Sequence, residues 1–318
     1  MDGPVVHMRR VVITGMGVVT PVGNTVRELW ENLKSGKSGI DRITRFDPTQ
    51  FSTQIAGEIK DFDASVYIDR KEARRMDLNQ QFAVAGAQQA FDDAGLKSNS
   101  LDPEQAGVVV GSGIGGIDTF EKQHSILLSQ GPNRVSPFFI PMMIVDMCAG
   151  LISMRFNLKG PNYATVSACA SGAHAIADAF KIIQRGEAEV MIGGGSEAAI
   201  TPVSFAGFCS ARALSTRNQE PHKASRPFDK QRDGFVMGEG AGILVLESLE
   251  HAQRRGARIY AELAGAGSTA DAYHITAPAP GGEGAIRAMK AALKDAGLSA
   301  DRVDYVNSHG TSTDLGDL

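Results

Sequence analysis

The chain has 318 residues, with 32 Lys and Arg against 36 Asp and Glu, and a formal net charge of −4. Hydrophobic residues make up 42% and charged residues 21% of the sequence, a composition typical of globular proteins. A net charge this close to neutral gives no field that attracts polyanions, so we expect no nucleic-acid partner. The longest apolar stretch, residues 138–154, is interrupted by Pro141 and Asp146. A membrane-spanning helix needs about 20 uninterrupted apolar residues, so we also expect no membrane association.

Residues 1–7 have neither the charged nor the apolar region of a secretory signal. Met8 opens the first regular segment, so we expect residues 1–7 to be a leader or a cloning remnant. The three cysteines, Cys148, Cys169 and Cys209, are too few and too scattered for a disulfide framework and lack metal-binding spacing. We therefore expect a cytoplasmic protein without a metal site.

Short β-branched runs alternate along the chain with Ala-rich amphipathic stretches. Their continuous apolar character predicts strands that are buried on both faces of a sheet. We expect these strands at residues 10–14, 107–110, 163–167, 189–192, 243–247 and 303–307. Helices are expected at residues 81–94 and 173–185, because each stretch is followed by a helix-ending glycine. The alternation predicts an α/β fold.

A heptad recurs within the chain, since Ala90-Phe-Asp-Asp-Ala-Gly-Leu96 is matched by Ala292-Leu-Lys-Asp-Ala-Gly-Leu298. Each copy leads to a predicted strand and then to a loop of small residues. This common order indicates a duplication and predicts two similar halves, residues 8–258 and 259–318. Because the second half would be far shorter than the first, we expect it to be incomplete and the chain to be truncated.

Cys169 lies between the strand predicted at 163–167 and the helix predicted at 173–185. Near a helix N-terminus, free backbone N–H groups and the positive end of the helix dipole favour the nucleophilic thiolate. Small neighbouring residues would let a substrate carbonyl approach, and adjacent N–H groups could stabilise an oxyanion. A buried structural cysteine is the alternative, and these residues alone leave both open. Five positions along the helix, His174 is expected to point away from Cys169.

His309 stands at the end of the strand predicted at 303–307 and is followed by Gly and three hydroxyl residues. This position suits hydrogen bonding to a ligand, although a histidine that caps local backbone is an open alternative.

Two further patterns are less specific. Gly111-Ser-Gly-Ile-Gly-Gly116 fits a dinucleotide-binding pattern, but residues 125–145 lack the acidic residue that such a site needs, so we expect no nucleotide site. Arg70, Lys71, Arg74 and Arg75 predict either a docking patch for an acidic partner or a solvated helix face.

Taken together, the motifs resemble the β-ketoacyl-acyl-carrier-protein synthases of fatty acid synthesis, most like the type II elongating enzymes. The resemblance covers nearly the whole chain from Met8. Its motifs are Val11-Val-Ile-Thr-Gly-Met-Gly17, Gly111-Ser-Gly-Ile-Gly-Gly116, Ser136-Pro-Phe-Phe139, Ser167-Ala-Cys-Ala-Ser-Gly172, Ala211-Arg-Ala-Leu-Ser215, Arg226-Pro-Phe-Asp229, Arg232-Asp-Gly-Phe-Val-Met-Gly-Glu-Gly-Ala-Gly242 and His309-Gly-Thr-Ser-Thr313.

The resemblance implies a thiolase-like layered α/β/α/β/α fold of two similar halves, of which the second is incomplete here. It also implies a decarboxylative Claisen condensation, in which an acyl chain moves from acyl carrier protein to Cys169. Malonyl carrier protein then loses carbon dioxide and attacks the acyl group. The enzyme would be a homodimer without a cofactor of its own, because phosphopantetheine is carried by the partner acyl carrier protein.

In this scheme Cys169 is the nucleophile, its backbone N–H is one oxyanion donor, and His309 hydrogen-bonds the malonyl thioester carbonyl. The substrate-binding positions that the resemblance implies are Ile114 in the acyl pocket at the dimer interface, Phe208 on the malonyl side, and Thr311 and Thr313 along the phosphopantetheine arm. The implied carrier-protein contacts are Lys71, Arg74, Arg75, Arg134, Arg212 and Thr276.

The sequence departs from the family pattern in two ways. Position 314 is Asp where the family usually has Pro. The family's second catalytic histidine, the lysine before it and the terminal glycine-rich loop would all lie beyond Leu318. We therefore expect the 318-residue chain to be inactive in condensation.

Three other interpretations have the same fold. A type I or polyketide ketosynthase would differ in carriers and chain length. A non-catalytic chain-length subunit typically lacks the nucleophile, so Cys169 argues against it. A coenzyme A-dependent thiolase is disfavoured by the run His309-Gly-Thr-Ser-Thr313.

Overall fold

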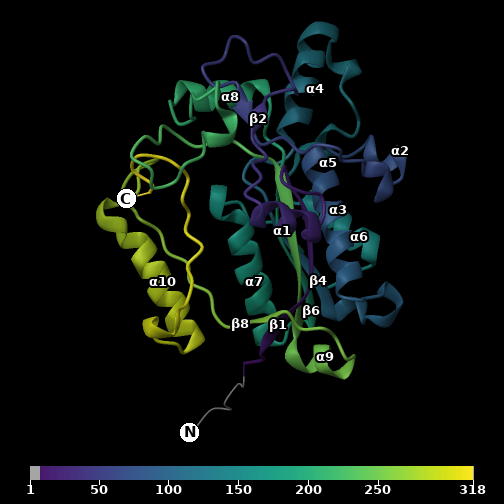
Figure 1. Cartoon of the computed structure of the whole chain (residues 1–318). Helices are drawn as coiled ribbons and strands as arrows, with labels where there is room; N and C mark the ends of the chain where they lie inside the picture. Colours follow the sequence, from purple (N-terminus) through teal and green to yellow (C-terminus); the bar gives the residue numbers. More distant parts are fainter. Residues whose placement is uncertain (1–7, 318) are drawn as a thin grey trace.

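A computed structural model describes residues 8–317, so the expectation for residues 1–7 falls outside the described residues. Its centre is a six-stranded sheet in the order β5-β4-β6-β7-β1-β8 (Figure 1). The strands are β1 (Val11–Val19), β4 (Ala106–Gly111), β5 (Asn162–Tyr163), β6 (Val190–Glu197), β7 (Gly240–Ser248) and β8 (Ala261–Leu263). β4 runs parallel to β5 and β6, whereas β7 is antiparallel to β6 and β1, and β1 is antiparallel to β8. The sheet is therefore mixed.

Helices cover both faces of this sheet. Val108 and Val110 of β4 pack in one core with α3 (Leu78–Asp93) and α6 (Met147–Phe156), whereas Val109 packs in another with α7 (Ser171–Arg185). Because successive side chains of a strand point to opposite faces, α7 lies on the face opposite α3 and α6. Every residue of β4 is buried, which confirms the predicted strand that is covered on both sides.

The sheet and the helices on its two faces form three layers, and the remaining elements surround them. The other α-helices are α1 (Val26–Lys34), α2 (Arg70–Ala73), α4 (Ile117–Gln130), α5 (Phe139–Met143), α8 (Pro202–Ser210), α9 (Leu249–Arg254) and α10 (Glu283–Ala296). A separate two-stranded sheet pairs β2 (Asp41–Arg42) with β3 (Ile55–Ala56). The 3-10 helices are η1 (Ala64–Val66), η2 (Ser98–Ser100), η3 (Pro103–Gln105), η4 (Pro132–Arg134), η5 (Ala168–Ala170), η6 (Pro221–Lys223), η7 (Pro280–Gly282) and η8 (Ala300–Arg302).

Both predicted helices are confirmed, and each begins before its expected start. α3 begins at Leu78 because Asp77 and Gln80 form a capping box at its N-terminus. α7 begins at Ser171 and ends before Gly186, which adopts a left-handed conformation with φ of 78°. Its buried residues include Ala175, Ala179, Ile182 and Ile183, the spacing of an amphipathic helix.

Among the predicted strands, the one at residues 303–307 is wrong, and the one at residues 163–167 is only partly right. Only the first residue of the 163–167 prediction lies in a strand, because β5 ends at Tyr163 and the chain then turns toward Cys169. Residues 303–307 form no strand, and Tyr305 and Val306 are exposed. A β-strand needs a partner for its backbone N–H and C=O groups, and no strand within residues 8–317 pairs with this segment.

The two copies of the repeated heptad have the same local geometry. They end α3 and α10, and the glycine that follows each helix is left-handed, with φ of 65° at Gly95 and 64° at Gly297. A Gly-x-Gly pair also approaches each helix closely. A Cβ placed on Gly15 or Gly265 would lie within 3 Å of the carbonyl oxygen of Ala90 or Ala292, respectively. The equivalent positions of the two heptads thus receive the same close backbone contact.

α10 lies apart from the sheet, on the side of α7 (Figure 1). Lys181 of α7 and Asp295 of α10 form an ion pair between the two helices. Between residues 8 and 317, no helix is both long enough and apolar enough to cross a membrane.

Candidate active site

Cys169 lies on a tight turn, residues 167–171, which we call the Cys169 turn. The turn contains the single 3-10 turn η5 and leads directly into α7 at Ser171. Ala168 adopts a left-handed conformation with φ of 51°, which is unfavourable for a residue with a Cβ. Cys169 is exposed, whereas Cys148 is buried. The predicted position of Cys169 at the N-terminus of a helix is therefore confirmed, and its thiol is open to solvent.

Side-chain hydrogen bonds hold this turn in place. The Ser171 hydroxyl donates to the Ala168 carbonyl at 2.7 Å and accepts the backbone N–H of Ser167 at 2.9 Å. The Thr165 hydroxyl donates to the Ser171 carbonyl at 2.8 Å. In the part of the chain that the structure describes, the backbone N–H of Cys169 donates to no other group, so it is available to an oxyanion.

His174 contacts the start of the Cys169 turn. Its Nδ1 atom lies 2.6 Å from the Ser167 hydroxyl. This bond is to Ser167, so the prediction that His174 points away from Cys169 stays a prediction. Cys169 precedes α7, and the left-handed Ala168 brings Ser167 within reach of the first turn of the helix.

A glycine-rich loop, residues 112–116, packs against the Cys169 turn. We call it the Gly113 loop; it connects β4 to α4 and carries Ile114, which is 40% exposed. A Cβ placed on Gly113 would lie 3.5 Å from Ala168 Cα. The structure therefore brings the loop of Ile114 next to the turn of Cys169, although these residues are far apart in the sequence.

The segment that follows His309 is fixed by a buried carboxylate that the sequence analysis missed. Asp317 accepts the backbone N–H groups of Thr311, Ser312 and Phe228 at 2.9–3.1 Å. Arg232 lies 3.6 Å from Asp317, and its side chain is only 8% exposed. Arg232 lies in one of the sequence motifs that resemble the family. That motif was the sequence signal that could have pointed to the contact with Asp317.

Ser312 anchors the same segment to the body of the protein. It is fully buried and left-handed, with φ of 67°. Its hydroxyl accepts the Arg226 N–H at 3.1 Å, and its carbonyl accepts the Gly234 N–H at 3.0 Å. His309 is exposed, and the Thr311 and Thr313 hydroxyls lie 3.0 Å apart. The loop is thus rigidly held on one side and presents His309 on the other.

The unusual Asp314 leaves these bonds intact. Asp314 is exposed, and its carbonyl accepts a hydrogen bond from the Arg232 guanidinium at 2.8 Å. Its side chain forms no hydrogen bond or ion pair to a described residue.

Phe208 packs against the part of the protein that anchors the segment after His309, residues 310–317, which we call the His309 segment. It lies on α8, is half-buried, and packs edge-to-face on Phe235 with ring centroids 5.4 Å apart. Phe235 directly follows Gly234, which bonds to Ser312. One short segment of backbone therefore supports both Phe208 and the loop after His309.

The basic residues lie in three surface segments. Lys71, Arg74 and Arg75 are exposed on and after α2, and the Arg75 guanidinium lies 4.4 Å from the centre of the Phe138 ring. Within residues 8–317, these three cations form no ion pair. Arg134 and Arg212 are also exposed, after α4 and α8 respectively. Thr276 is exposed in the loop before α10, where its backbone N–H donates to His274 Nδ1 at 3.1 Å.

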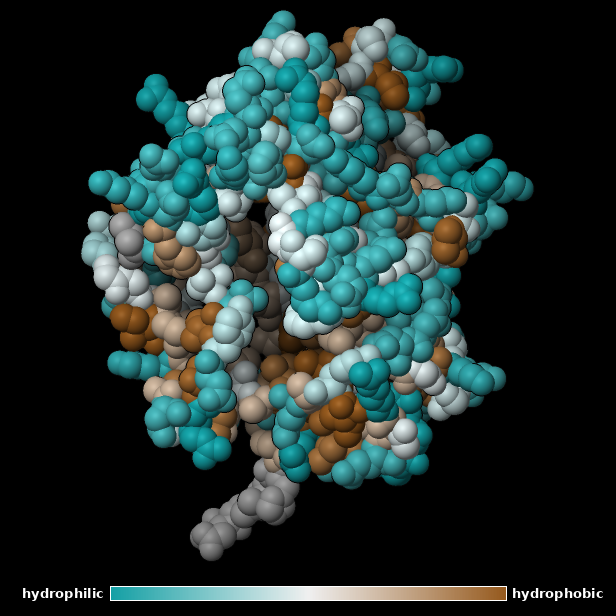
Figure 2. Space-filling model, in the orientation of Figure 1, coloured by the Kyte–Doolittle hydropathy of each residue, from teal (hydrophilic) through white to brown (hydrophobic). Residues whose placement is uncertain are grey.

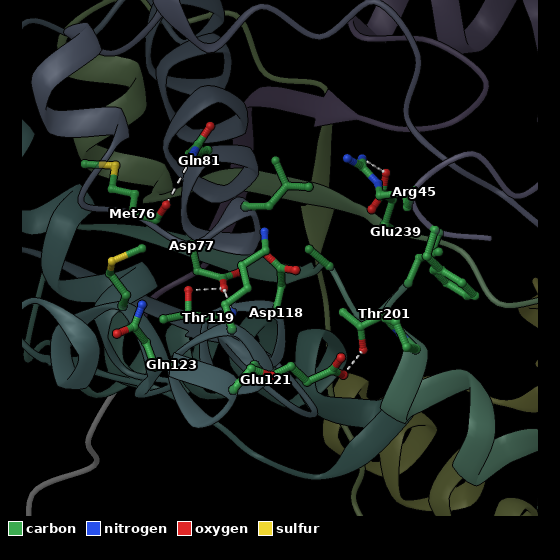
Figure 3. Close-up of a pocket in the computed structure, with 18 of the residues that line it drawn as sticks. Arg45, Met76, Asp77, Gln81, Asp118, Thr119, Glu121, Gln123, Thr201 and Glu239 are labelled. Carbon is green, nitrogen blue, oxygen red and sulfur yellow. Dashed lines mark hydrogen bonds and ion pairs between the residues drawn. The ribbon is translucent and has the colours of Figure 1, made fainter. Parts of the chain in front are cut away.

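A cavity of about 960 Å³ lies between α3, α4 and α8 (Figure 3). Its charged groups are satisfied by neighbouring side chains: Asp77 accepts the Thr119 hydroxyl at 2.6 Å, Glu121 accepts the Thr201 hydroxyl, and Arg45 pairs with Glu239. Burial raises the pKa values of Asp77 and Glu239 despite these hydrogen bonds. Of the predicted site residues, only Arg74 lines this cavity. Within residues 8–317, no three His, Cys, Asp or Glu side chains are grouped to hold a metal ion.

Comparison with known families matches both parts of the chain. Residues 8–252 match the family described as Beta-ketoacyl synthase, N-terminal domain, and residues 260–318 match Beta-ketoacyl synthase, C-terminal domain. The chain is 56% identical to 3-oxoacyl-[acyl-carrier-protein] synthase 2 of Synechocystis sp. over 98% of its own length and 74% of that protein. It is 57% identical to the protein of the same name from Staphylococcus aureus, over 98% of this chain and 75% of that protein.

Solved structures agree with this assignment. A β-ketoacyl synthase from Burkholderia phymatum superposes with a TM-score of 0.90 at 39% identity, covering 98% of this chain and 76% of the other. A type II polyketide ketosynthase complex with its acyl-carrier protein, AntDE:AntF, superposes with a TM-score of 0.86 at 34% identity, covering 98% and 75%. The predicted α/β, thiolase-like ketosynthase fold is confirmed, and the chain belongs to the β-ketoacyl synthase family.

Proposed function

We propose that this protein is a β-ketoacyl-acyl-carrier-protein synthase that elongates fatty acids. The observation that carries the proposal is Cys169, exposed on a tight turn at the N-terminus of α7 with a free backbone N–H. The Cys169 thiolate attacks the thioester carbonyl of an acyl carrier protein. A new carbon–sulfur bond forms, and the carrier thiol leaves as the tetrahedral intermediate collapses.

The second step forms a carbon–carbon bond. Malonyl carrier protein loses carbon dioxide, and the resulting carbanion attacks the acyl group on Cys169. The cysteine thiolate is released, and the product is a 3-oxoacyl carrier protein. We assign to His309 a hydrogen bond to the malonyl thioester carbonyl, where negative charge develops as carbon dioxide leaves.

The substrate-binding residues follow the resemblance. We assign Ile114 to the acyl pocket, Phe208 to the malonyl side, and Thr311 and Thr313 to the phosphopantetheine arm. The Gly113 loop, which packs on the Cys169 turn, supports the first of these assignments. The shared attachment of Phe208 and the His309 segment to Gly234 and Phe235 supports the others.

The partner that we assign is acyl carrier protein, which supplies phosphopantetheine, so the enzyme needs no cofactor of its own. Exposed cations without an internal partner suit docking of an acidic protein. The contacts assigned to this surface are Lys71, Arg74, Arg75, Arg134, Arg212 and Thr276.

We also propose a cytoplasmic homodimer. The three cysteines are unpaired, as a reducing compartment requires. β5 is the edge strand of the central sheet, and both its residues are exposed. The unpaired backbone groups of such an edge can bind the same strand of a second copy.

The test of acyl loading is the intact mass of the chain after incubation with an acyl carrier protein, beside a Cys169→Ala control. A mass gain equal to one acyl group that is absent in the control is the expected result. No gain in a folded chain would contradict the role of Cys169.

The expectation that the 318-residue chain loads an acyl group but does not condense it stays a prediction. Addition of malonyl carrier protein tests it, since a 3-oxoacyl product would overturn that expectation.

A polyketide ketosynthase is the second candidate, because a solved relative at 34% identity is a type II polyketide ketosynthase. Carrier proteins distinguish the two. Loading by fatty acyl carriers, but not by a polyketide carrier bearing the same acyl group, is expected for fatty acid elongation.

A further inference from the structure

Glu197 ends the strand next to β4, at the same edge of the sheet as the Gly113 loop. β4 and β6 are parallel, and Gly111 pairs with Gly195, so Glu197 lies two residues beyond the last pair. Gly195 also supports the start of α7, since a Cβ placed on Gly195 would lie 3.0 Å from Gly172 Cα. The end of β6 therefore lies beneath both the Gly113 loop and the Cys169 turn.

The Glu197 carboxylate binds three consecutive residues of the Gly113 loop. Its Oε2 atom accepts the backbone N–H groups of Gly113 at 2.7 Å and Ile114 at 3.1 Å. Its Oε1 atom accepts the Ser112 hydroxyl at 2.9 Å, and that hydroxyl accepts the Gly115 N–H at 3.0 Å. One side chain thus fixes the direction of the backbone that carries Ile114.

The loop is confined on its other sides as well. Gly113 packs on Ala168 of the Cys169 turn, and a Cβ placed on Gly116 would lie 2.1 Å from the Met142 carbonyl oxygen. Ala168, the Met142 carbonyl and Glu197 thus hold the loop from three sides, and the loop cannot shift unless one of these contacts is lost. Loss of the carboxylate would release the loop at Ile114, next to the Cys169 turn.

Glu197 has no cationic partner in the described part of the chain. Burial raises its pKa, and the hydrogen bonds from Ser112, Gly113 and Ile114 oppose that increase. A half-buried carboxylate without a counter-ion is unfavourable unless its hydrogen bonds are satisfied. Those donors come from the Gly113 loop alone, so the local role of Glu197 is to hold that loop.

We propose that Glu197 is a positioning residue that sets Ile114 against the Cys169 turn and thereby determines which acyl chains Cys169 accepts. This inference rests on the proposed function, because it takes Ile114 as part of the acyl pocket. A long chain contacts more of the pocket wall than a short chain, so its transfer depends more on where Ile114 lies.

The test compares rates of acyl transfer to Cys169 from butyryl and dodecanoyl carrier protein, measured by intact mass. Glu197→Ala is expected to lower the ratio of the dodecanoyl rate to the butyryl rate by about tenfold, because the hydrogen bonds to Ser112, Gly113 and Ile114 that fix the loop are lost. Glu197→Gln keeps an acceptor for Gly113 and Ile114, so it is expected to restore the wild-type ratio to within about twofold. Glu121→Gln is the matched control, because Glu121 also accepts a hydroxyl and a backbone N–H, but at α8.

An equal loss with both acyl donors, or an unchanged ratio in a folded Glu197→Ala variant, would overturn the inference. If that variant does not fold, Ser112→Ala decides, with a smaller decrease of the same ratio expected and an unchanged ratio contradicting the proposal. A wild-type chain that takes neither acyl group overturns the proposed function instead, and the inference with it.

Discussion

At the scale of single residues, Ala168 is the residue whose backbone most directly shapes the Cys169 turn. Its left-handed conformation lets Ser167 reach Ser171 and His174, while Cys169 remains exposed. Such a conformation costs a residue with a Cβ about 1 kcal/mol relative to glycine. The hydrogen bonds around the turn offset this cost.

Ala168→Gly is therefore expected to raise the free energy of unfolding by about 0.5 kcal/mol, because relief of the backbone strain exceeds the entropy that glycine adds to the unfolded chain. Ala170→Gly is the control, since Ala170 has a φ of −84° and the same substitution there should be destabilising. Thermal denaturation measures both. Equal effects of the two substitutions would contradict a strained Ala168.

Sequence patterns predicted the position of Cys169 but not its surroundings. A strand followed by small residues and an amphipathic helix was sufficient to place Cys169 at a helix N-terminus. The contact of His174 with Ser167 depends on the conformation of Ala168, which no periodicity indicates. The bonds from Glu197 to Gly113 and from Asp317 to Phe228 join residues more than 80 positions apart, and a single sequence carries no direct signal for such contacts.

At the scale of secondary-structure elements, one buried carboxylate joins three of them. Glu247 of β7 is fully buried and accepts hydrogen bonds from Thr14 of β1, His251 of α9 and Arg255 at the end of α9. Burial alone would raise the pKa of Glu247. The three hydrogen-bond donors outweigh that effect and lower its pKa from 4.5 to about 2.

A carboxylate whose pKa is lowered by folding stabilises the protein above its unfolded pKa, and this stabilisation is lost as the pH falls through the folded pKa. Glu247→Gln is expected to lower the free energy of unfolding at neutral pH by on the order of 3 kcal/mol. The difference from wild type should decrease between pH 4.5 and about 2. Urea unfolding across this range measures it, with Glu250→Gln on the exposed face of α9 as the control. A difference that does not vary with pH would contradict this role for Glu247.

A strand or helix was predictable from the sequence where the residue pattern within that element alone determines which of its side chains are buried. The valine run of β4 and the helical spacing of α7 each indicate one structure without reference to the rest of the chain. Residues 303–307 have the composition of a strand, yet they pair with no strand in the described chain. Strand formation depends on a partner as much as on composition.

At the scale of the whole molecule, the near-neutral net charge conceals local surfaces of one sign. Lys71, Arg74 and Arg75 are exposed and unpaired within the described residues, whereas many other cations form ion pairs with nearby carboxylates.

Figure 2 shows a largely hydrophilic surface and a hollow with hydrophobic residues beside α10. Ile286 and Met289 of α10 are exposed.

Charge reversal tests the carrier-protein surface. Lys71→Glu together with Arg74→Glu is expected to raise the concentration of acyl carrier protein that gives half the maximal rate of acyl transfer to Cys169 by about tenfold at low ionic strength, and by less as salt screens the charges. The maximal rate of acyl transfer should change little, because neither residue lies in the Cys169 turn. Lys97→Glu introduces the same kind of charge change at another exposed position, and an equal effect of that control would contradict a specific docking surface.

In the proposed reaction, Cys169 carries the acyl group. The most direct measurement is peptide mass mapping of the chain after incubation with acyl carrier protein, which shows which cysteine forms the thioester. We predict an acyl group on the peptide that contains Cys169 and none on the peptides of Cys148 and Cys209. An acyl group on Cys148 or Cys209 with Cys169 unmodified would contradict the role of Cys169 as the nucleophile.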